Sequence, residues 1–316
     1  MSEEITERDA LLELLRENVR EQRRARRWRM FTRLVGLAVV ALVVLSLARV
    51  DLSPDEQRGP HTAEVRIDGA IMAETSASAD RVIQGLERAF EADGVEGVVL
   101  RINSPGGSAV HARQIYQEIQ RLREAHEDIP LYAVIEDVGA SGAYYAAAAA
   151  EKIYVNESSL VGSIGVIMGS FGLQEAAEKL GIERRLYTAG EHKAFLDPFS
   201  PEQEEEVEHV QTMLDEIHGQ FIAAVREGRG ERLDEAGVDE DRLFSGLIWT
   251  GSRSLELGLA DRIGSARSVA REEIGAEERV DYTARGDLFA QLAERFGTAF
   301  GRGAYEALQS LDYQVR

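Results

Sequence analysis

Apolar and polar positions along this chain alternate in blocks that predict strands and helices in turn. Short apolar runs bounded by turn residues predict strands at 63–71, 97–103, 131–136, 153–156 and 163–168. Helical spacing of apolar residues predicts helices at 79–92, 111–127, 144–150, 173–180 and 201–227. Because strands that alternate with helices join into parallel sheets through crossovers, the pattern predicts an α/β fold.

One apolar run has a different character. Residues 34–48 carry no charge and no polar face, and Met30, Phe31 and the flanking arginine stems bring the run close to the roughly 20 residues that a bilayer requires. The run predicts a transmembrane anchor at 30–50. Residues 23–29 before it include five arginines, so the positive-inside rule places residues 1–29, a charged helix, in the cytoplasm and everything after residue 50 outside.

A cleavable signal peptide is the alternative to an anchor, because residues 46–48 (SLA) resemble a small-x-small cleavage site. The long charged segment before the apolar run favours an uncleaved anchor. Residues 51–62, which carry two prolines, predict a linker. A folded domain is expected at 63–270, followed by a C-terminal helical extension at 271–316.

Composition narrows the possible functions. The 316 residues have a formal net charge of −20, which argues against a nucleic-acid partner. Residues 1–33 carry nine arginines against seven acidic residues, so the remainder carries about −22; a solvated acidic surface explains this most simply. The chain has no cysteine, which excludes disulfides, thiol catalysis and cysteine-bound metals. No cofactor or metal is expected.

Lysine is rare in this chain. Of the 36 basic residues only Lys152, Lys179 and Lys193 are lysines. Unlike arginine, lysine can lose its proton when its environment disfavours the charge. An arginine-rich genome would also produce this scarcity, so it raises the question of lysine chemistry without answering it.

Two turns with small residues follow predicted strands. Residues 103–107 (NSPGG) form a loop that either only needs glycine for a positive φ, or offers backbone N–H groups to a developing oxyanion. Ser141, in residues 139–145 (GASGAYY), lies between a strand and a helix, where it is either a nucleophile or an N-cap.

A serine nucleophile needs a base. Most of the six histidines lie in the linker or on charged helix faces, and only His192, beside Lys193, lies in a suitable loop. Lysine can serve as the base if its pKa falls from about 10.4 toward 7, which costs roughly 4–5 kcal/mol. A neutral amine also requires a hydroxyl partner, for which Ser163 is a candidate.

Taken in order, six segments resemble the signal peptide peptidase A family of membrane-bound serine peptidases, in its short single-copy bacterial form. They are NSPGG at 103–107, GASGAYY at 139–145, AEKIYVN at 150–156, GSIGV at 162–166, GEHK at 190–193 and LELGLAD at 255–261. The resemblance covers residues 63–264. It implies the Clp protease/crotonase fold of repeated ββα units and a Ser-Lys dyad that cuts hydrophobic peptides such as released signal peptides at the inner membrane.

By motif, the resemblance makes Ser141 the nucleophile, Lys193 the general base and Ser163 the hydroxyl that orients the lysine. Gly107 and Gly142 match the backbone donors of the oxyanion hole. It also implies a homo-oligomeric ring in which neighbouring protomers complete each dyad. Lys152 is interpreted as structural and Lys179 as a surface residue. Residues 195–198 (FLDP) depart from the more polar sequence expected after the lysine.

Two other functions fit the same fold. A crotonase-like acyl-CoA enzyme would use similar backbone donors, but it would work with glutamates in the cytoplasm, and the predicted anchor argues against it. A non-catalytic, membrane-anchored scaffold would not need both Ser141 and Lys193. Among peptidases, a relative that cleaves intact membrane proteins is a further alternative.

Overall fold

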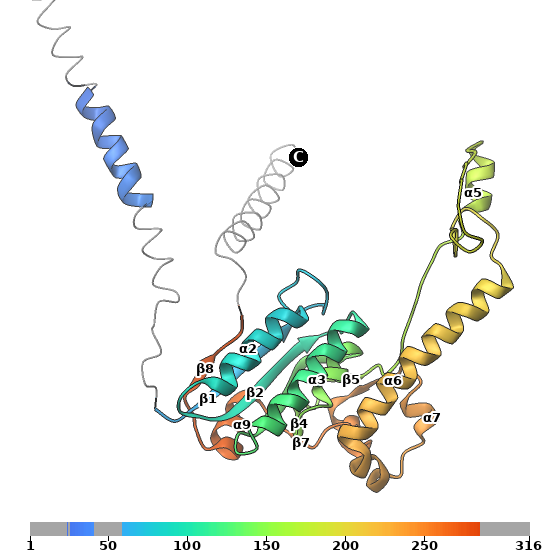
Figure 1. The fold of residues 1–316 in the computed structure, drawn as a ribbon. Helices are drawn as coiled ribbons and strands as arrows, with labels where there is room; N and C mark the ends of the chain where they lie inside the picture. Colours follow the sequence, from blue (N-terminus) through green and yellow to red (C-terminus); the bar gives the residue numbers. More distant parts are fainter. Residues whose placement is uncertain (1–23, 25, 41–58, 285–316) are drawn as a thin grey trace, which may run out of the picture. The chain divides into compact units, whose positions relative to one another are not determined.

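The structure, a computed structural model, describes residues 24, 26–40 and 59–284 (Figure 1). The chain divides into two compact units, Met1–Glu56 and Gln57–Arg316. The charged helix expected at 1–29, much of the linker at 51–62 and the C-terminal extension after residue 284 fall largely outside the described residues.

In the first unit, residues 26–40 form a helix whose side chains are all exposed. They include Trp28, Phe31 and Leu37, which are 66%, 57% and 72% exposed. Within the described ranges, none of the helices combines the length and the apolar character needed to cross a bilayer. Half of the predicted anchor, residues 41–50, lies outside those ranges, so the anchor stays a prediction.

The second unit is an eight-stranded sheet with helices packed on it (Figure 1). Its strands are β1 (His61–Asp68), β2 (Val95–Ser104), β3 (Leu131–Ala140), β4 (Lys152–Val155), β5 (Leu160–Gly162), β6 (Ile248–Thr250), β7 (Arg262–Ile263) and β8 (Arg279–Asp281). Its helices are α2 (Ala79–Glu91), α3 (Ala109–Ala125), α4 (Gly142–Ala147), α5 (Gln174–Lys179), α6 (Glu204–Ala236), α7 (Glu240–Leu243), α8 (Gly251–Glu256), α9 (Ala266–Val269) and a π-helical turn, η1 (Ala270–Ile274).

The sheet runs in the order β6-β5-β3-β2-β1-β8, and β3 divides it into two branches. The first half of β3 pairs with β4, from Tyr132 beside Lys152 onward, and its second half pairs with β5, from Val138 beside Leu160. All pairs are parallel except β5 with β6. The carboxyl ends of β2, β3 and β5 therefore meet at one edge, which is where parallel sheets place their sites.

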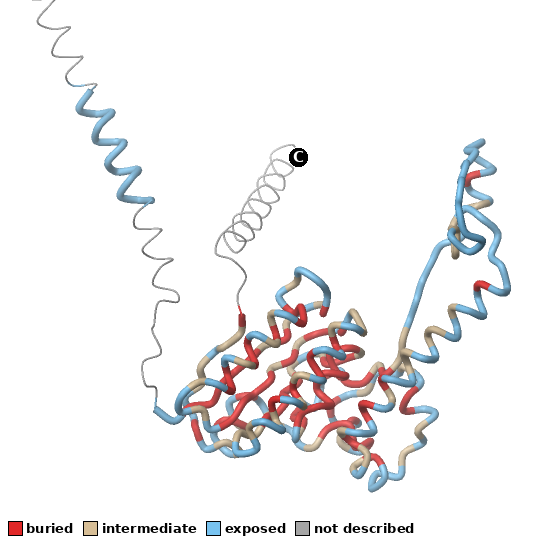
Figure 2. The backbone as a smooth tube through the Cα atoms, in the orientation of Figure 1, coloured by how far each residue is buried: buried red, intermediate tan, exposed pale blue. Residues whose placement is uncertain are grey.

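Apolar side chains cover both faces of the central strands, as expected for a parallel sheet. Along β2, Val98, Leu100 and Ile102 belong to the large core cluster that also contains the buried residues of α2, α3 and α4. Val99 faces the opposite way and packs in a smaller cluster with α9. Figure 2 shows these buried segments running through the centre of the unit.

A buried ion pair connects the second half of α6 to the loop before β7. Arg229, which is fully buried, donates to Asp261 at 2.7 Å and to the Gly258 carbonyl at 2.9 Å. Burial by itself would raise the pKa of Asp261, but the bonds from Arg229 and from the Ile153 N–H hold that pKa below its usual value. The pair fixes α6 on the sheet, because breaking it would leave a buried charge without a partner.

The α/β class expected from the sequence is confirmed, and most predicted elements lie within a few residues of the observed ones. The strand predicted at 163–168 is wrong: the paired strand is β5, at 160–162, and the chain leaves the sheet at Ser163, where φ is 51°. Helix α6 continues to Ala236, nine residues past its predicted end at 227. Strand β8 lies beyond residue 270 and pairs with β1.

Candidate active site

Ser141 occupies a sharp turn between β3 and α4. Its backbone has φ 54° and ψ −127°, a region that residues with a side chain rarely adopt. The Ser141 N–H donates to the Gly162 carbonyl at 2.8 Å, and the Ser141 carbonyl accepts from the Tyr145 N–H at 3.0 Å. This strand-to-helix turn is the geometry of a nucleophile elbow.

The hydroxyl of Ser141 does not cap α4. Ser141 stands at the N-cap position, but its side chain makes no capping hydrogen bond. The alternative interpretation of Ser141 as a side-chain N-cap is therefore wrong. Backbone strain of this kind costs of order 1–3 kcal/mol and is concentrated at functional sites, which favours a chemical role for the free hydroxyl.

The glycine turn after β2 lies directly against the Ser141 turn. Gly106 has φ 91°, and a Cβ atom on it would lie 2.6 Å from the Gly142 nitrogen and 2.8 Å from the Ser141 Cβ. The buried Ser104 hydroxyl accepts from the Gly106 N–H at 3.1 Å and fixes the turn. Glycine is required at position 106 because the two backbones approach too closely for any side chain.

Two backbone N–H groups next to Ser141 have no acceptor among residues 59–284. The Ile71 N–H donates to the Gly106 carbonyl at 2.9 Å, and the Ile71 carbonyl accepts from the Ser108 N–H at 2.8 Å. In this parallel pairing the intervening Gly107 N–H points away from Ile71. The Gly142 N–H opens α4, where no turn precedes it to accept the bond. A Cβ on Gly142 would lie 3.4 Å from the Gly107 nitrogen, so the two amides lie close together. Two unpaired amides this close together suit an oxyanion.

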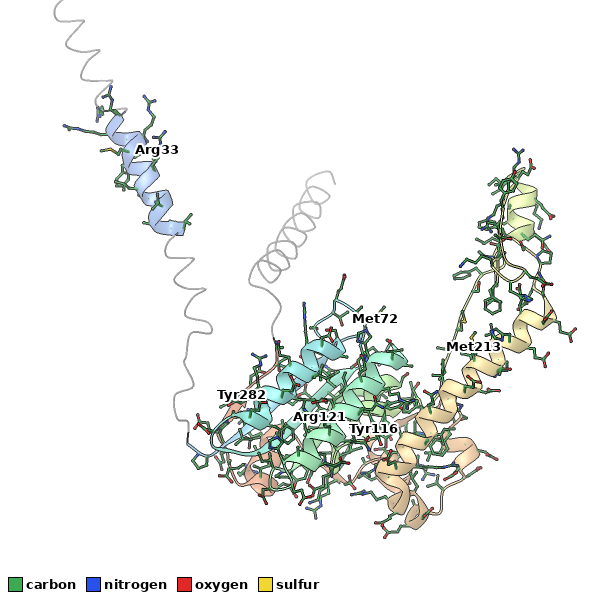
Figure 3. The ribbon with its side chains drawn as sticks, in the orientation of Figure 1. Arg33, Met72, Tyr116, Arg121, Met213 and Tyr282 are labelled. Atoms are coloured by element: carbon green, nitrogen blue, oxygen red, sulfur yellow. The ribbon has the colours of Figure 1, made fainter. Side chains whose placement is uncertain are left out.

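A cavity of about 200 Å³ opens beside Ser141. It is lined by the two turns, by the segment after β5 and by α6, through Gly107, Ala109, Ser141, Gly142, Tyr145, Gly165, Val166, Ile167, Ile217 and Phe221. The Tyr145 and Phe221 rings stack at 4.7 Å, and Tyr116 meets Tyr145 edge-on at 5.3 Å (Figure 3 labels Tyr116). The walls are mainly apolar. The sequence does not single out Ile217 and Phe221, because their helical spacing is the same for a cavity wall and for a core.

The titratable groups near this cavity do not include an evident base. Burial raises the pKa of Tyr145, which keeps its phenol neutral. His218 follows the lining residue Ile217, and its Nε2 donates to the Ile164 carbonyl at 3.2 Å, so that nitrogen is engaged. Among the contacts of the described residues, none joins Tyr145 or the other ring nitrogen of His218 to the Ser141 hydroxyl.

Ser163 directly follows Gly162, whose carbonyl accepts the Ser141 N–H. It is part-buried with φ 51°, and its N–H donates to the Leu247 carbonyl at 2.7 Å. Ser141 and Ser163 are thus fixed through a common strand end, the Gly162 carbonyl of β5. The structure brings together four of the five predicted site residues: Ser141, Ser163, Gly107 and Gly142.

Lys193 is not among them. It is exposed in a loop of what we name the arm, residues 167–203, which includes α5. Phe195 of this loop meets His209 at 5.7 Å on α6, whereas the cavity lies at Phe221 of the same helix. At 1.5 Å per residue these two helix positions are about 18 Å apart. The Lys193 loop is therefore held against α6 well away from the Ser141 cavity.

The other two lysines have surface or structural partners. Lys152 donates to Glu273 at 2.9 Å and lies 5.5 Å from the Tyr132 ring; the hydrogen bond to Glu273 raises the Lys152 pKa. Lys179 pairs with Glu175 at 3.3 Å on the exposed face of α5. Lys193, by contrast, has no hydrogen bond or ion pair from its ammonium group to any described residue.

Comparison with known proteins identifies the family. The model of peptidase family S49 matches residues 123–279, and a provisionally named protease of Synechocystis is 30% identical over 203 residues, 64% of this chain and 69% of that protein. The chain belongs to peptidase family S49. The match includes the Ser141 turn, Ser163 and Lys193, whereas the glycine turn at 103–107 lies outside it, before α3.

Two other relatives are longer than this chain. A protein of Brucella abortus named Na⁺/H⁺ antiporter NhaA is 43% identical over 216 residues, which are 67% of this chain and 29% of that protein. A protein of Enterococcus faecium provisionally named signal peptide peptidase SppA is 34% identical over 57% of this chain and 50% of its own length. The chain thus spans half or less of these two relatives. A solved membrane-bound stomatin-specific protease covers 72% of the chain and 95% of itself at 16% identity, with a TM-score of 0.40.

We predict that Gly106→Ala disables this S49 site more than it destabilises the fold. The added Cβ would displace Ser141 or the Gly142 amide, and a 1 Å misplacement costs about 100-fold in rate; overpacking costs about 1–3 kcal/mol. The rate of fluorophosphonate labelling at Ser141 and the urea midpoint measure the two effects. Gly219→Ala, on α6 with open space around it, is the control. Labelling of Gly106→Ala at the wild-type rate would contradict the packing argument.

Proposed function

We propose that the chain is a membrane-anchored serine endopeptidase that hydrolyses hydrophobic peptides, such as released signal peptides, through Ser141 and Lys193. The single observation that supports it most is the free Ser141 hydroxyl on a strained turn beside two unpaired amides. That arrangement is what a nucleophilic serine with an oxyanion hole requires, and family membership agrees with it.

In the proposed reaction, the Ser141 Oγ attacks the scissile carbonyl while Lys193, as a neutral amine, accepts the hydroxyl proton. The N–H groups of Gly107 and Gly142 donate to the oxyanion that forms. Lys193 then gives the proton to the departing amine, and the acyl-enzyme is hydrolysed by water activated in the same way. The Ser163 hydroxyl, fixed one residue from the Gly162 carbonyl, would orient the lysine amine.

We infer that the lysine comes from a neighbouring protomer in a homo-oligomeric ring. The distance along α6 between the Lys193 loop and the cavity supports this, as does the apolar surface of the arm. Ile167, Phe171 and Tyr187 are 92%, 81% and 89% exposed (Figure 2 shows the exposed arm). Apolar surface on this scale is typical of interfaces between protein chains.

Hydrophobic peptides are the proposed substrate class, since the cavity beside Ser141 has mainly apolar walls. Residues 165–167, which form one of these walls, leave the sheet after β5 without pairing to another described strand. An extended peptide could add to this backbone as a further strand and place alternate side chains in the cavity.

Membrane anchoring is part of the proposal and rests on the apolar run at 34–48 after the arginine-rich segment. We expect the full chain to fractionate with the inner membrane, with its N-terminus in the cytoplasm. Proteolysis of spheroplasts tests the orientation: added protease should digest the region 63–270. If that region is protected until the membrane is broken, the peptidase faces the cytoplasm and this part of the proposal is wrong.

We expect Ser141→Ala, Lys193→Ala and Lys193→Arg each to lower peptide hydrolysis by at least about 1,000-fold without unfolding. Arginine keeps the charge but cannot accept the serine proton, so Lys193→Arg should be as inactive as Lys193→Ala. Lys179→Arg, on the same arm, is the matched control and should retain full turnover. Substantial turnover by Lys193→Arg would assign the base elsewhere, with His192 as the first residue to examine.

Mixing two inactive variants tests whether the dyad forms between protomers. If Ser141→Ala and Lys193→Ala chains are co-assembled in equal amounts, about a quarter of neighbouring pairs in a ring contain one intact serine facing one intact lysine. We therefore expect about a quarter of wild-type activity in the mixture and none in either variant alone. A mixture that stays inactive, although both variants assemble together, would show that each dyad forms within one chain.

A further inference from the structure

The residues after Lys193 that depart from the family pattern, 195–198, do not face the Ser141 cavity. Asp197, with a side chain only 6% exposed, forms an ion pair with Arg184 of the arm. It also accepts from the Ser200 hydroxyl at 2.8 Å. The Pro198 carbonyl accepts from the Leu173 N–H at 2.6 Å, just before α5. These contacts hold residues 195–198 against other residues of the arm.

A second buried carboxylate connects the same loop to α6. Glu206, 8% exposed in the first turn of α6, accepts from the Leu196 N–H through Oε2 at 3.1 Å. Glu206 is the buried member of the acidic run at 202–208, whose other carboxylates lie on exposed residues. A carboxylate at a helix N-terminus is also favoured by the helix dipole, so its position is stable without a cation.

Leu196 needs such a fixed acceptor. Its φ is 51°, which a leucine rarely adopts. A residue in this region stays there only when surrounding contacts hold it. The turn that carries Lys193 closes through the Phe195 N–H donating to the His192 carbonyl at 3.1 Å and the Asp197 N–H donating to the Ala194 carbonyl at 3.1 Å. Leu196 lies inside this turn, three residues after Lys193.

Helix α6 connects the Glu206–Leu196 hydrogen bond to the cavity. The helix is continuous from Glu204 to Ala236, and its later residues Ile217 and Phe221 line the cavity next to Ser141. A rigid helix that holds the lysine loop at one end and a cavity wall at the other sets where the lysine lies relative to the sheet. Met213, labelled in Figure 3, lies on α6 between the two ends.

We propose that Glu206 is a positioning residue: by accepting from the Leu196 N–H, it holds the Lys193 loop on α6 in the orientation that delivers the amine to a serine. This inference rests on the proposed role of Lys193. Glu206 does not contact substrate and has no ion pair with Lys193; it acts through the loop backbone. The requirement is an oxygen acceptor at this position, and the negative charge is secondary.

The test uses the full chain in detergent and three substitutions in the first turn of α6. Glu206→Ala removes the acceptor and should lower kcat about 10- to 100-fold, with KM changed less than about threefold, because the peptide-binding groups are untouched. Glu206→Gln keeps an oxygen and should stay within about threefold of wild type. Glu204→Ala, which removes an exposed charge from the same turn, should match wild type. If Glu206→Ala does not fold, Glu206→Met takes its place with the same expectation.

The rate of fluorophosphonate labelling at Ser141 then separates positioning from other effects. In a Lys193→Ala background, Glu206→Ala should cause no further decrease, since its effect passes through the lysine. A further decrease there, wild-type kcat in Glu206→Ala, or Glu206→Gln as impaired as Glu206→Ala would each overturn the positioning role. These outcomes would not contradict the proposed Ser-Lys dyad. Full activity of Lys193→Arg, by contrast, would contradict the dyad.

Discussion

The contact on which the site depends is the close approach of two backbones at the carboxyl ends of β2 and β3. Gly106 lies so near Ser141 and Gly142 that a single methyl group would not fit between them. The approach has two consequences: it holds Ser141 at its strained φ, and it brings the Gly107 and Gly142 amides, which have no acceptor among the described residues, close together. Parallel pairing of β2 with β3 supplies the scaffold.

Helix α6 is the second organising element. Its later half is fixed to the sheet by the buried Arg229–Asp261 pair, and its first turn carries the arm through Glu206. The helix therefore holds one catalytic candidate, Lys193, well away from the other, Ser141. This separation within one chain supports the proposal that neighbouring copies complete the dyad.

The apolar arm and the acidic composition place opposite demands on the chain. Exposed residues such as Ile167 and Phe171 favour association, while a net charge of −20 disfavours it by repulsion between copies. Salt screens such repulsion over about 10 Å at 0.1 M. Because the arm's large apolar side chains would be buried in the proposed ring, that assembly is expected to be more stable at higher ionic strength.

Much of this protein could be predicted from its sequence, because the determining signals are local. Periodicity predicted the α/β class and most element positions, and the motifs indicated Ser141, Ser163, Gly107 and Gly142, which the fold brings together. Local sequence also explains the one wrong strand: residues 163–168 read as apolar and extended, but no described strand pairs with them.

Tertiary structure decided what depends on residues far apart in the chain. The free hydroxyl of Ser141 could not be distinguished from an N-cap until the approach of Gly106 and the bond to the Gly162 carbonyl were known. The same holds for the part of the cavity wall that α6 contributes and for the hydrogen bond between Glu206 and Leu196. Both bring together elements whose relation cannot be read from spacing in the sequence. The sequence determined which residues carry the chemistry, since residue type sets what a group can do; the packing of helix on sheet decided which of them meet, since distance is a property of the folded chain.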